Sequence, residues 1–407
     1  MDFSLDYTPE QEKFATEVRE WIDKNVPDDL VYPAETTKMT DEDWQKRFEI
    51  RRKLGEKGWL YPEYPREFGG GGMSSDIAFV LYEELDHIRL GLTFFQEASL
   101  MAAGISACAT EEQKKIYLSQ ICKGEVRCWQ LFTEPEAGTD EANQKINALI
   151  AVPDGDDYIV NGQKTFVGAL PLYPDRFWLL TRSNLDLPRH ENLTMFFAPA
   201  DLPGIKFEAL DLFSAGHYGA FAGISGPTRP TGAGVKFSVY FEDVRVPKEY
   251  VIGEPGDGWK VVTKTLEVEH GGYGWIERNA IAAAFLDHCK NNPVVKKRLK
   301  ANPELVSNVV EAYIGAQIER LFALRNLAGE GGDYGGPQLA MRFKIFGAKL
   351  SRIMTEVLGP AALTDDPRWG YEGDVIEVGV RAGICISPGG TPEASKINIS
   401  RALSIGR

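Results

Sequence analysis

Apolar side chains recur at helical spacing in the first part of the chain. Residues 8–11, Thr-Pro-Glu-Gln, have the pattern of a helix start in which a capping box closes the first turn. The apolar residues that follow share one helical face: Phe14, Val18, Trp21 and Ile22. Further helices are expected near residues 41–57, 75–90 and 110–122. The first part of the chain is therefore predicted to be helical.

The pattern changes between about 126 and 250. Residues 157–160 and 164–167 are rich in strand-forming side chains, and Asn161-Gly162 between them predicts a tight turn. Further β-rich runs lie at 176–181, 194–198 and 235–241. Because no helical stretch separates these runs, we expect an antiparallel sheet and an all-β middle domain.

Helical spacing returns after Val246-Pro247. Long periodic segments lie near 257–290, 293–329 and 336–358, and a loop is expected at 329–332. The expected fold class is α+β multidomain, with an N-terminal α-helical domain (1–125), a middle antiparallel β domain (126–248) and a C-terminal α-helical domain (249–407).

A glycine run at 69–72 suggests a phosphate-binding loop. No Lys-Ser/Thr follows it and no strand precedes it, so a turn is the better interpretation. The chain also contains no GxGxxG and no GxxxxGK[ST] sequence. A nucleotide cofactor would therefore have to be held by another arrangement.

Composition excludes several classes of protein. The 45 basic and 59 acidic residues give a net charge of −14, so we expect no nucleic-acid surface. No apolar stretch is long enough for a membrane span, and no secretory signal is recognised. The five cysteines form no CxxC pair and are interpreted as reduced thiols of a cytoplasmic protein. The five histidines form no metal-binding pair, so no metal site is expected.

Three local sequences resemble those of the acyl-CoA dehydrogenase family, and the resemblance covers essentially the whole chain. Residues 132–140, Phe-Thr-Glu-Pro-Glu-Ala-Gly-Thr-Asp, resemble a family segment that runs along the flavin towards the acyl-CoA. Residues 161–168 resemble the family's Asn-Gly-x-Lys-x-Trp-Ile-Thr, with Phe166 and Gly168 in place of Trp and Thr. Residues 241–247, followed by Gly258-Trp259, match the exit from the family's β domain into its catalytic helix.

The resemblance implies a C-terminal four-helix bundle, FAD as cofactor and an acyl-CoA thioester as substrate. The residues that it assigns to the flavin are Phe132, Thr133, Gly138, Thr139, Phe166, Val167, Gly168, Gly390, Thr391 and Glu393. Thr139, Glu267 and His270 are expected to contact the substrate, and His270 stands where the family has Arg. Phe166 has an alternative interpretation, since an aromatic residue on a strand usually belongs to the core.

The family's reaction needs a carboxylate that removes the α-proton of the thioester. Many members take it from a C-terminal Tyr-Glu-Gly-Thr, but residues 387–393 here read Ser-Pro-Gly-Gly-Thr-Pro-Glu. Gly389 therefore occupies the usual position of the base. Its backbone amide can still donate a hydrogen bond to the thioester oxygen, because that role needs no side chain.

Two other carboxylates are candidates for the base. Glu372 belongs to a literal Tyr-Glu-Gly, but it lies in a stretch rich in Gly, Asp and Pro. Glu269 lies eleven residues beyond Gly258, a register at which some family members carry their base. It shares a helix side with Val262 and Leu266, and an apolar setting raises a carboxyl pKa. We expect Glu269 to be the base; the alternative is a solvated helix carboxylate.

The leading hypothesis is an acyl-CoA dehydrogenase that passes electrons to an electron-transfer flavoprotein. Alternatives are an oxidase or elimination reaction on the same scaffold, and a lapsed subunit of a heteromer. The Gly-Gly-Thr at 389–391 resembles a bacterial branch that acts on bulky or cyclic acyl-CoAs, some of whose members pair unlike subunits. A homotetramer or an α2β2 assembly is expected, although the family's Arg-x-x-Phe-Gly contact with a neighbour's FAD is missing.

Overall fold

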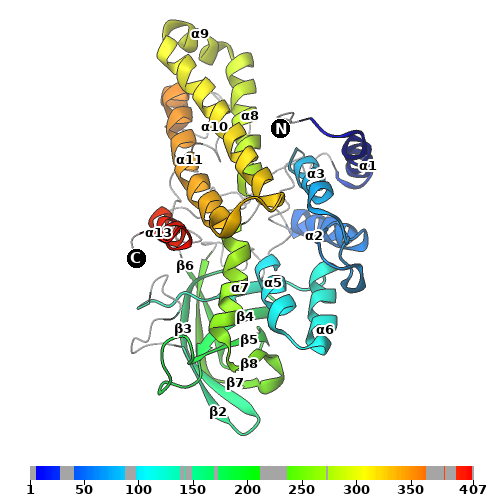
Figure 1. Cartoon of the computed structure of the whole chain (residues 1–407), viewed down its shortest axis with the longest axis vertical. Coiled ribbons are helices and arrows are strands. Elements are labelled where there is room, and N and C mark those ends of the chain that lie inside the picture. The colour runs from blue at the N-terminus through cyan, green and yellow to red at the C-terminus, as the bar shows by residue number, and fades with distance from the viewer. Residues whose placement is uncertain are drawn as a thin grey trace.

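In the computed structural model the β-sheet lies at the bottom of the view, with the C-terminal helices above it and the N-terminal helices to one side (Figure 1). The structure describes residues 6–27, 41–87, 98–137, 142, 149–168, 173–210, 236–271, 274–363, 380 and 391–405. This order of helices, sheet and helices confirms the predicted fold class. The exact domain boundaries at 125/126 and 248/249 stay a prediction.

The N-terminal helices begin where the capping signals place them. Thr8 accepts a hydrogen bond from the Gln11 backbone, and the Gln11 side chain accepts one from the Thr8 backbone, which confirms the capping box. Val18 and Ile22 are buried on the predicted face. The helices of this region are α1 (Pro9–Asn25), α2 (Asp41–Glu56), α3 (Ser75–His87), α5 (Ser99–Cys108) and α6 (Glu111–Cys122).

The middle strands form one mixed sheet in the order β6-β7-β3-β2-β4-β5-β8, with β1 paired to β4. The strands are β1 (Cys128–Leu131), β2 (Ile150–Asp154), β3 (Asp157–Val167), β4 (Arg176–Arg182), β5 (Leu193–Pro199), β6 (Ile205–Leu210), β7 (Lys236–Pro247) and β8 (Val251–Gly256). Most pairings are antiparallel as expected, but β1 runs parallel to β4 and β2 meets β4 in one parallel register. The expectation of a purely antiparallel sheet is therefore wrong. β1 and β4 are not joined by a hairpin, so they are not constrained to run in opposite directions.

The predicted turn at Asn161-Gly162 is also wrong. Residues 157–167 form one continuous strand, β3, and the hairpin turn lies earlier, around Gly155 with its φ of +66°. At Asn161-Gly162 the pairing of β3 with β7 is shifted in register, and the Asn161 side chain exchanges hydrogen bonds with Asp243. Asn161-Gly162 therefore lies at a β-bulge rather than a turn, because β7 continues to pair with β3 on both sides of it.

The C-terminal helices pack along one another above the sheet (Figure 1). The expected segment 293–329 is divided into two helices at Asn302, because Pro303 lacks an N–H and disfavours a helical residue before it. The segment 257–290 likewise corresponds to two helices. The helices are α7 (Gly258–Gly271), α8 (Gly274–Asn291), α9 (Pro293–Ala301), α10 (Pro303–Leu327), α11 (Gly335–Leu358) and α13 (Pro392–Ala402).

The glycine run at 69–72 forms a close-packed turn, as predicted. The Gly70 amide donates to Pro65 and the Gly71 amide to Tyr61, so these N–H groups are already used within the turn. A Cβ at Gly70 would lie 2.2 Å from the Tyr64 carbonyl oxygen, so a side chain is excluded there. The glycines are therefore explained by packing rather than by phosphate binding, although a cavity of about 870 Å³ opens beside them.

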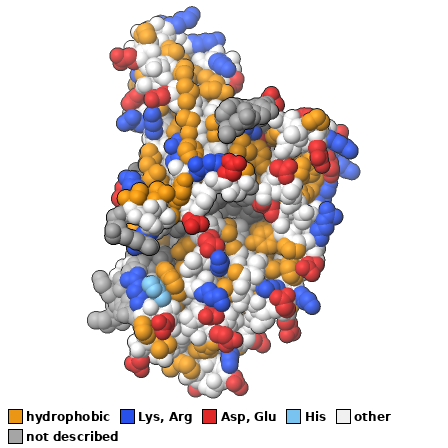
Figure 2. Space-filling view, in the orientation of Figure 1, with side chains coloured by type: hydrophobic (Ala, Val, Ile, Leu, Met, Phe, Trp, Pro, Cys, Tyr) orange, Lys and Arg blue, Asp and Glu red, His pale blue; other side chains and the backbone are white. Residues whose placement is uncertain are grey.

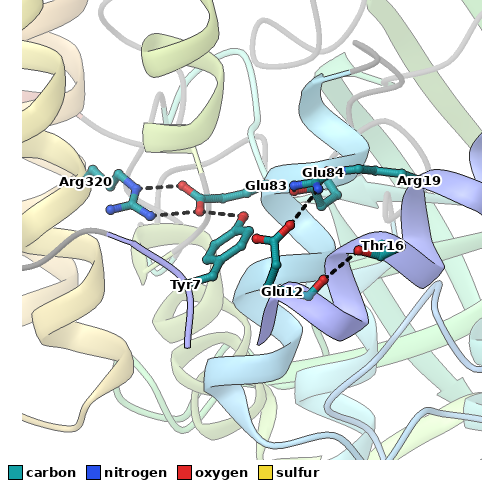
Figure 3. Close-up of polar contacts among 7 residues, drawn as sticks. All are labelled: Tyr7, Glu12, Thr16, Arg19, Glu83, Glu84 and Arg320. Atoms are coloured by element: carbon teal, nitrogen blue, oxygen red, sulfur yellow. Dashed lines mark hydrogen bonds and ion pairs between the residues drawn. The ribbon is translucent and has the colours of Figure 1, made fainter. Parts of the chain in front are cut away.

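Helix α3 ties the N-terminal helices to the C-terminal ones (Figure 3). Glu83 accepts two hydrogen bonds from Arg320 of α10, at 2.7 and 2.9 Å, and one from the Tyr7 hydroxyl at 3.0 Å. The next residue, Glu84, accepts two from Arg19 of α1, both at 2.7 Å. Burial and the Glu83 carboxylate raise the pKa of Tyr7, so its hydroxyl remains a donor. We call these five residues the seam network.

Within the described residues, no helix combines the length and apolar composition that a membrane crossing needs. The cysteines of this part of the chain are free thiols: Cys108, Cys122, Cys128 and Cys289. Cys385 lies outside the described residues.

Candidate functional site

The Thr-Glu-Pro segment and the strand that carries Asn-Gly-Gln-Lys meet in a buried ionic cluster. Lys164 Nζ donates to Glu134 Oε1 and to the Phe132 carbonyl oxygen, each at 2.8 Å. Arg182 Nη1 lies 3.3 Å from Glu134 Oε2. We call Glu134, Lys164 and Arg182 the buried triad. It connects two motifs that the sequence analysis placed at the same site.

The buried triad keeps Glu134 ionised. Burial by itself raises the pKa of this carboxyl, but Lys164, the Leu149 amide and Arg182 together hold it below its usual value. The side chains of the triad are at most 8% exposed, so solvent does not screen these charges. With two cations around one carboxylate, residues 132–134 are fixed against β3.

The backbone of Thr133 is joined directly to β3. The Thr165 amide donates to the Thr133 carbonyl oxygen at 2.9 Å, and the Thr165 and Ser238 hydroxyls lie 3.3 Å apart. This contact places Thr133 beside the residue that precedes Phe166. Two of the residues assigned to the flavin, Thr133 and Phe166, are thereby brought to one place.

Phe166 lies at an irregularity of β3 and is exposed. Its φ is +55°, which is an outlier for a bulky residue, and the pairing with β7 shifts in register between Lys164 and Val167. Its side chain is 56% exposed, whereas Val167 is buried. The alternative in which Phe166 belongs to the core is therefore wrong. The ring is available to stack on a planar group.

Gly168 has a left-handed backbone conformation and lies against Trp129, a residue that was not predicted from the sequence. Its φ is +101°, and a Cβ there would lie 3.3 Å from the Trp129 ring. The Lys236 ammonium donates to the Gly168 carbonyl oxygen from the neighbouring strand. The indole thus occupies the space that a larger side chain at 168 would need.

Helix α7 carries the candidate base, Glu269. Val262 is buried and Leu266 packs against the same hydrophobic core, so the predicted apolar side of α7 is covered at these positions. The side chains of Glu269 and His270 lie outside the described residues. Glu267 is exposed and forms an ion pair with Lys264 at 2.9 Å. The roles of Glu267, Glu269 and His270 stay predictions.

At the C-terminal end, Thr391 and Glu393 belong to the start of α13. The Thr391 side chain caps the helix by accepting from the Ala394 amide at 3.3 Å, and Glu393 lies 3.6 Å from Lys396. The remaining candidate residues lie outside the described part of the chain: Gly138, Thr139, Glu372, Gly389 and Gly390.

Comparisons with known proteins match two parts of the chain to one family. Residues 8–125 match the acyl-CoA dehydrogenase N-terminal domain, and residues 130–219 match the acyl-CoA dehydrogenase middle domain. The chain belongs to the acyl-CoA dehydrogenase family. It is thus a flavin-dependent oxidoreductase, as the three motifs predicted.

The relatives in sequence align with different lengths of this chain. Acyl-CoA dehydrogenase FadE29 of Mycobacterium tuberculosis is 31% identical over 269 residues, which are 65% of this chain and 62% of that relative. Acyl-CoA dehydrogenase FadE26 of the same organism is 27% identical over 377 residues, 88% of this chain and 87% of the relative.

Similar solved structures include two complexes. The crystal structure of the ChsE4-ChsE5 complex from Mycobacterium tuberculosis matches with a TM-score of 0.79 and 25% identity, covering 100% of both chains. The Tcur3481-Tcur3483 steroid ACAD matches with a TM-score of 0.75 and 24% identity, again over 100% of both chains. The second of these supports the fold alone.

Proposed function

We propose that this chain is an FAD-dependent acyl-CoA dehydrogenase. In this reaction a base removes the α-proton of an acyl-CoA thioester, the β-hydrogen leaves with its electron pair, and a C=C bond forms between the α- and β-carbons. FAD, when bound, supplies the acceptor for the hydride. The observation that carries the proposal is the exposed Phe166 ring, held on a strained bulge beside Thr133.

The described residues fit a planar cofactor at this place. Phe166 offers a ring for stacking, and the buried triad holds the Thr133 backbone at a fixed position beside it. Phe132, Val167 and Gly168 belong to the same two segments, and Gly138, Thr139, Gly390, Thr391 and Glu393 complete the proposed flavin contacts. Electrons would pass on to an electron-transfer flavoprotein.

Binding of FAD is tested by titration of the colourless apoprotein. Replacing Phe166 with Leu removes a stacking surface worth about 1 kcal/mol, so the dissociation constant of FAD should rise roughly fivefold. Leu185, exposed on the loop before β5, provides a control, since Leu185→Ala changes an apolar surface away from the bulge. A parent protein that stays colourless in excess FAD would contradict the proposal.

We assign the base to Glu269, with the Gly389 amide donating to the thioester oxygen and with Thr139, Glu267 and His270 at the substrate. A base near neutrality needs an apolar, water-poor setting. The burial of Val262 and the packing of Leu266 on the same side of α7 support such a setting along this helix.

The base is tested by Glu269→Gln, which keeps size and removes the basic lone pair. Flavin reduction by a true substrate should slow about 10²- to 10⁴-fold. Glu254, an exposed carboxylate on β8, provides the control, and Glu254→Gln should reduce flavin at the parent rate. Parent-like reduction by Glu269→Gln would reject the assignment and make Glu372 the next candidate.

The substrate class is proposed from the Gly-Gly-Thr at 389–391, which resembles a bacterial branch that acts on bulky or cyclic acyl-CoAs. The assembly is proposed from α10 and from a relative of known structure. Helix α10 also carries an exposed apolar stripe, and Figure 2 shows hydrophobic side chains over the helices at the top of the view. The stripe consists of Val306, Val310, Tyr313, Ile314, Ile318 and Leu321, each between 36% and 50% exposed.

Such a stripe suits subunit contact, so we propose a homotetramer or an α2β2 assembly. One relative of known structure is itself a complex of two named chains, ChsE4 and ChsE5, which supports the second form. Light scattering of the flavin-loaded protein measures the mass of the assembly. A particle of 45.2 kDa, the mass of one chain, would contradict both.

A further inference from the structure

One buried hydrogen bond lies where the N-terminal helices, the sheet and the C-terminal helices meet. Trp178 of β4 donates through Nε1 to Thr265 Oγ1 of α7 at 3.2 Å, and both residues are fully buried. Gly104 of α5 lies against both: a Cβ there would be 2.5 Å from Trp178 Cζ2 and 3.1 Å from Thr265 Oγ1. We call Gly104, Trp178 and Thr265 the three-way junction.

The hydroxyl of Thr265 has two partners in this junction. It accepts from the Trp178 indole and donates to the Val261 carbonyl oxygen, one turn earlier in α7, at 3.0 Å. A buried indole N–H needs an acceptor, because a buried donor without one destabilises the fold by its full desolvation free energy. The threonine therefore fixes both the height and the rotation of α7 relative to β4.

We infer that Thr265 is a positioning residue for Glu269, an inference that rests on the proposed role of Glu269 as the base. Thr265 lies four residues before Glu269, which is about 6 Å along an α-helix. Between these two positions α7 is one continuous helix. A shift of about 1 Å in a reacting group can cost about a hundredfold in rate.

The close approach at Gly104 makes the junction stiff. The Trp178 ring is buried among large side chains and cannot move away from an added methyl group without displacing its neighbours. Helix α5 consequently holds Trp178 from one side while Thr265 holds it from the other. The position of α7 is thus set by all three parts of the fold.

The test uses Thr265→Val, which keeps the shape and removes the acceptor, and Thr265→Ser, which retains the hydroxyl. Both are made in the flavin-loaded parent and in Glu269→Gln, and flavin reduction and KM are measured. We expect Thr265→Val to slow reduction at least tenfold with KM and flavin content unchanged, and Thr265→Ser to stay within about twofold. In the Glu269→Gln background, Thr265→Val should cause no further loss.

Other outcomes separate the inference from the proposed function. A parent-like Thr265→Val, or an equal loss in both backgrounds, overturns the positioning role. A parent-like Glu269→Gln overturns the proposed base instead. If Thr265→Val does not retain flavin, Trp178→Phe replaces it, since this change removes the donor while Thr265 keeps its bond to Val261. In Thr265→Val the Trp178 indole N–H loses its acceptor, so its signal should no longer be protected. This readout does not depend on activity.

Discussion

Glu134 in the buried triad and Glu83 in the seam network are both held by cations, but their surroundings differ. Glu134, with Lys164 and Arg182, is almost wholly buried, so its charges interact without screening. Glu83 and Arg320 are 15% and 12% exposed and lie where two groups of helices meet. The first cluster fixes the two motifs of the candidate flavin site, and the second fixes how separate parts of the molecule are arranged.

The comparison shows that similar ion pairs carry different consequences when one partner is removed. In a buried cluster, the remaining cations lose the group that compensates for their desolvation. At a partly exposed seam, water can take over part of that role. Substitutions in the two clusters should therefore differ in how much stability they remove and in which region of the molecule they destabilise.

The largest effect is expected for Glu134→Gln. This change removes the charge that Glu134 provides to the buried Lys164 and Arg182, and the free energy of unfolding should fall by about 3–5 kcal/mol. Urea denaturation followed by circular dichroism measures it. The exposed pair of Lys206 and Glu242 gives the control, and Glu242→Gln should change stability by about 0.5 kcal/mol or less. Equal losses of unfolding free energy in the two variants would show that burial does not set the effect of removing a carboxylate.

A smaller effect, about 2 kcal/mol, is expected for Glu83→Gln, which weakens the hold of α3 on Arg320. Its matched control is Glu84→Gln, which changes the next residue and affects Arg19 of α1 instead. Hydrogen exchange should rise in α10 for the first variant and in α1 for the second. The same exchange pattern in both would show that α3 does not act as a link between the two groups of helices.

An acid-dependent effect is expected from the lowered pKa of Glu134. Because its folded pKa lies below the unfolded value of about 4.3, its contribution is complete above that pH and is lost as pH falls through the folded pKa. For one proton the slope is at most about 1.4 kcal/mol per pH unit. Unfolding measured from pH 6 down to about pH 3 should be less steep in Glu134→Gln than in the parent; identical curves would contradict this.

The smallest effect is expected for Tyr7→Phe. The hydroxyl gives Glu83 a third hydrogen bond, and its loss should cost about 1 kcal/mol while the two bonds from Arg320 remain. Thermal unfolding measures the change. A loss as large as that of Glu83→Gln would mean that the phenol, rather than the guanidinium, holds the seam.

Much of the fold could be predicted from local signals. The capping box at Thr8 and Gln11 and the turn at 69–72 depend on neighbours in the sequence, and both are confirmed. Asn161-Gly162 misled because its preference for a turn is local, whereas the long partner strand β7 keeps β3 extended. The break at Pro303 was readable from the proline itself.

The candidate site was predictable only in part. Phe166 and Thr133 were proposed from motif resemblance, but the pairing of Glu134 with Lys164 joins residues 30 positions apart and has no local signature. Trp178 and Thr265 are separated by 87 positions. Neither stands out in the sequence, because a single aromatic or hydroxyl residue forms no recognisable pattern with its neighbours. Contacts between distant segments decide these features, so only the folded chain reveals them.

The meeting of Gly168 with the Trp129 ring has a consequence for how the family's sequences can vary. The two positions share one volume, since a Cβ at 168 would already lie 3.3 Å from the indole. The φ of +101° at the first position also strains any side chain there, whatever the space around it. A relative that carries a hydroxyl-bearing side chain at this position should therefore differ both in the backbone that follows β3 and in the residue that faces it.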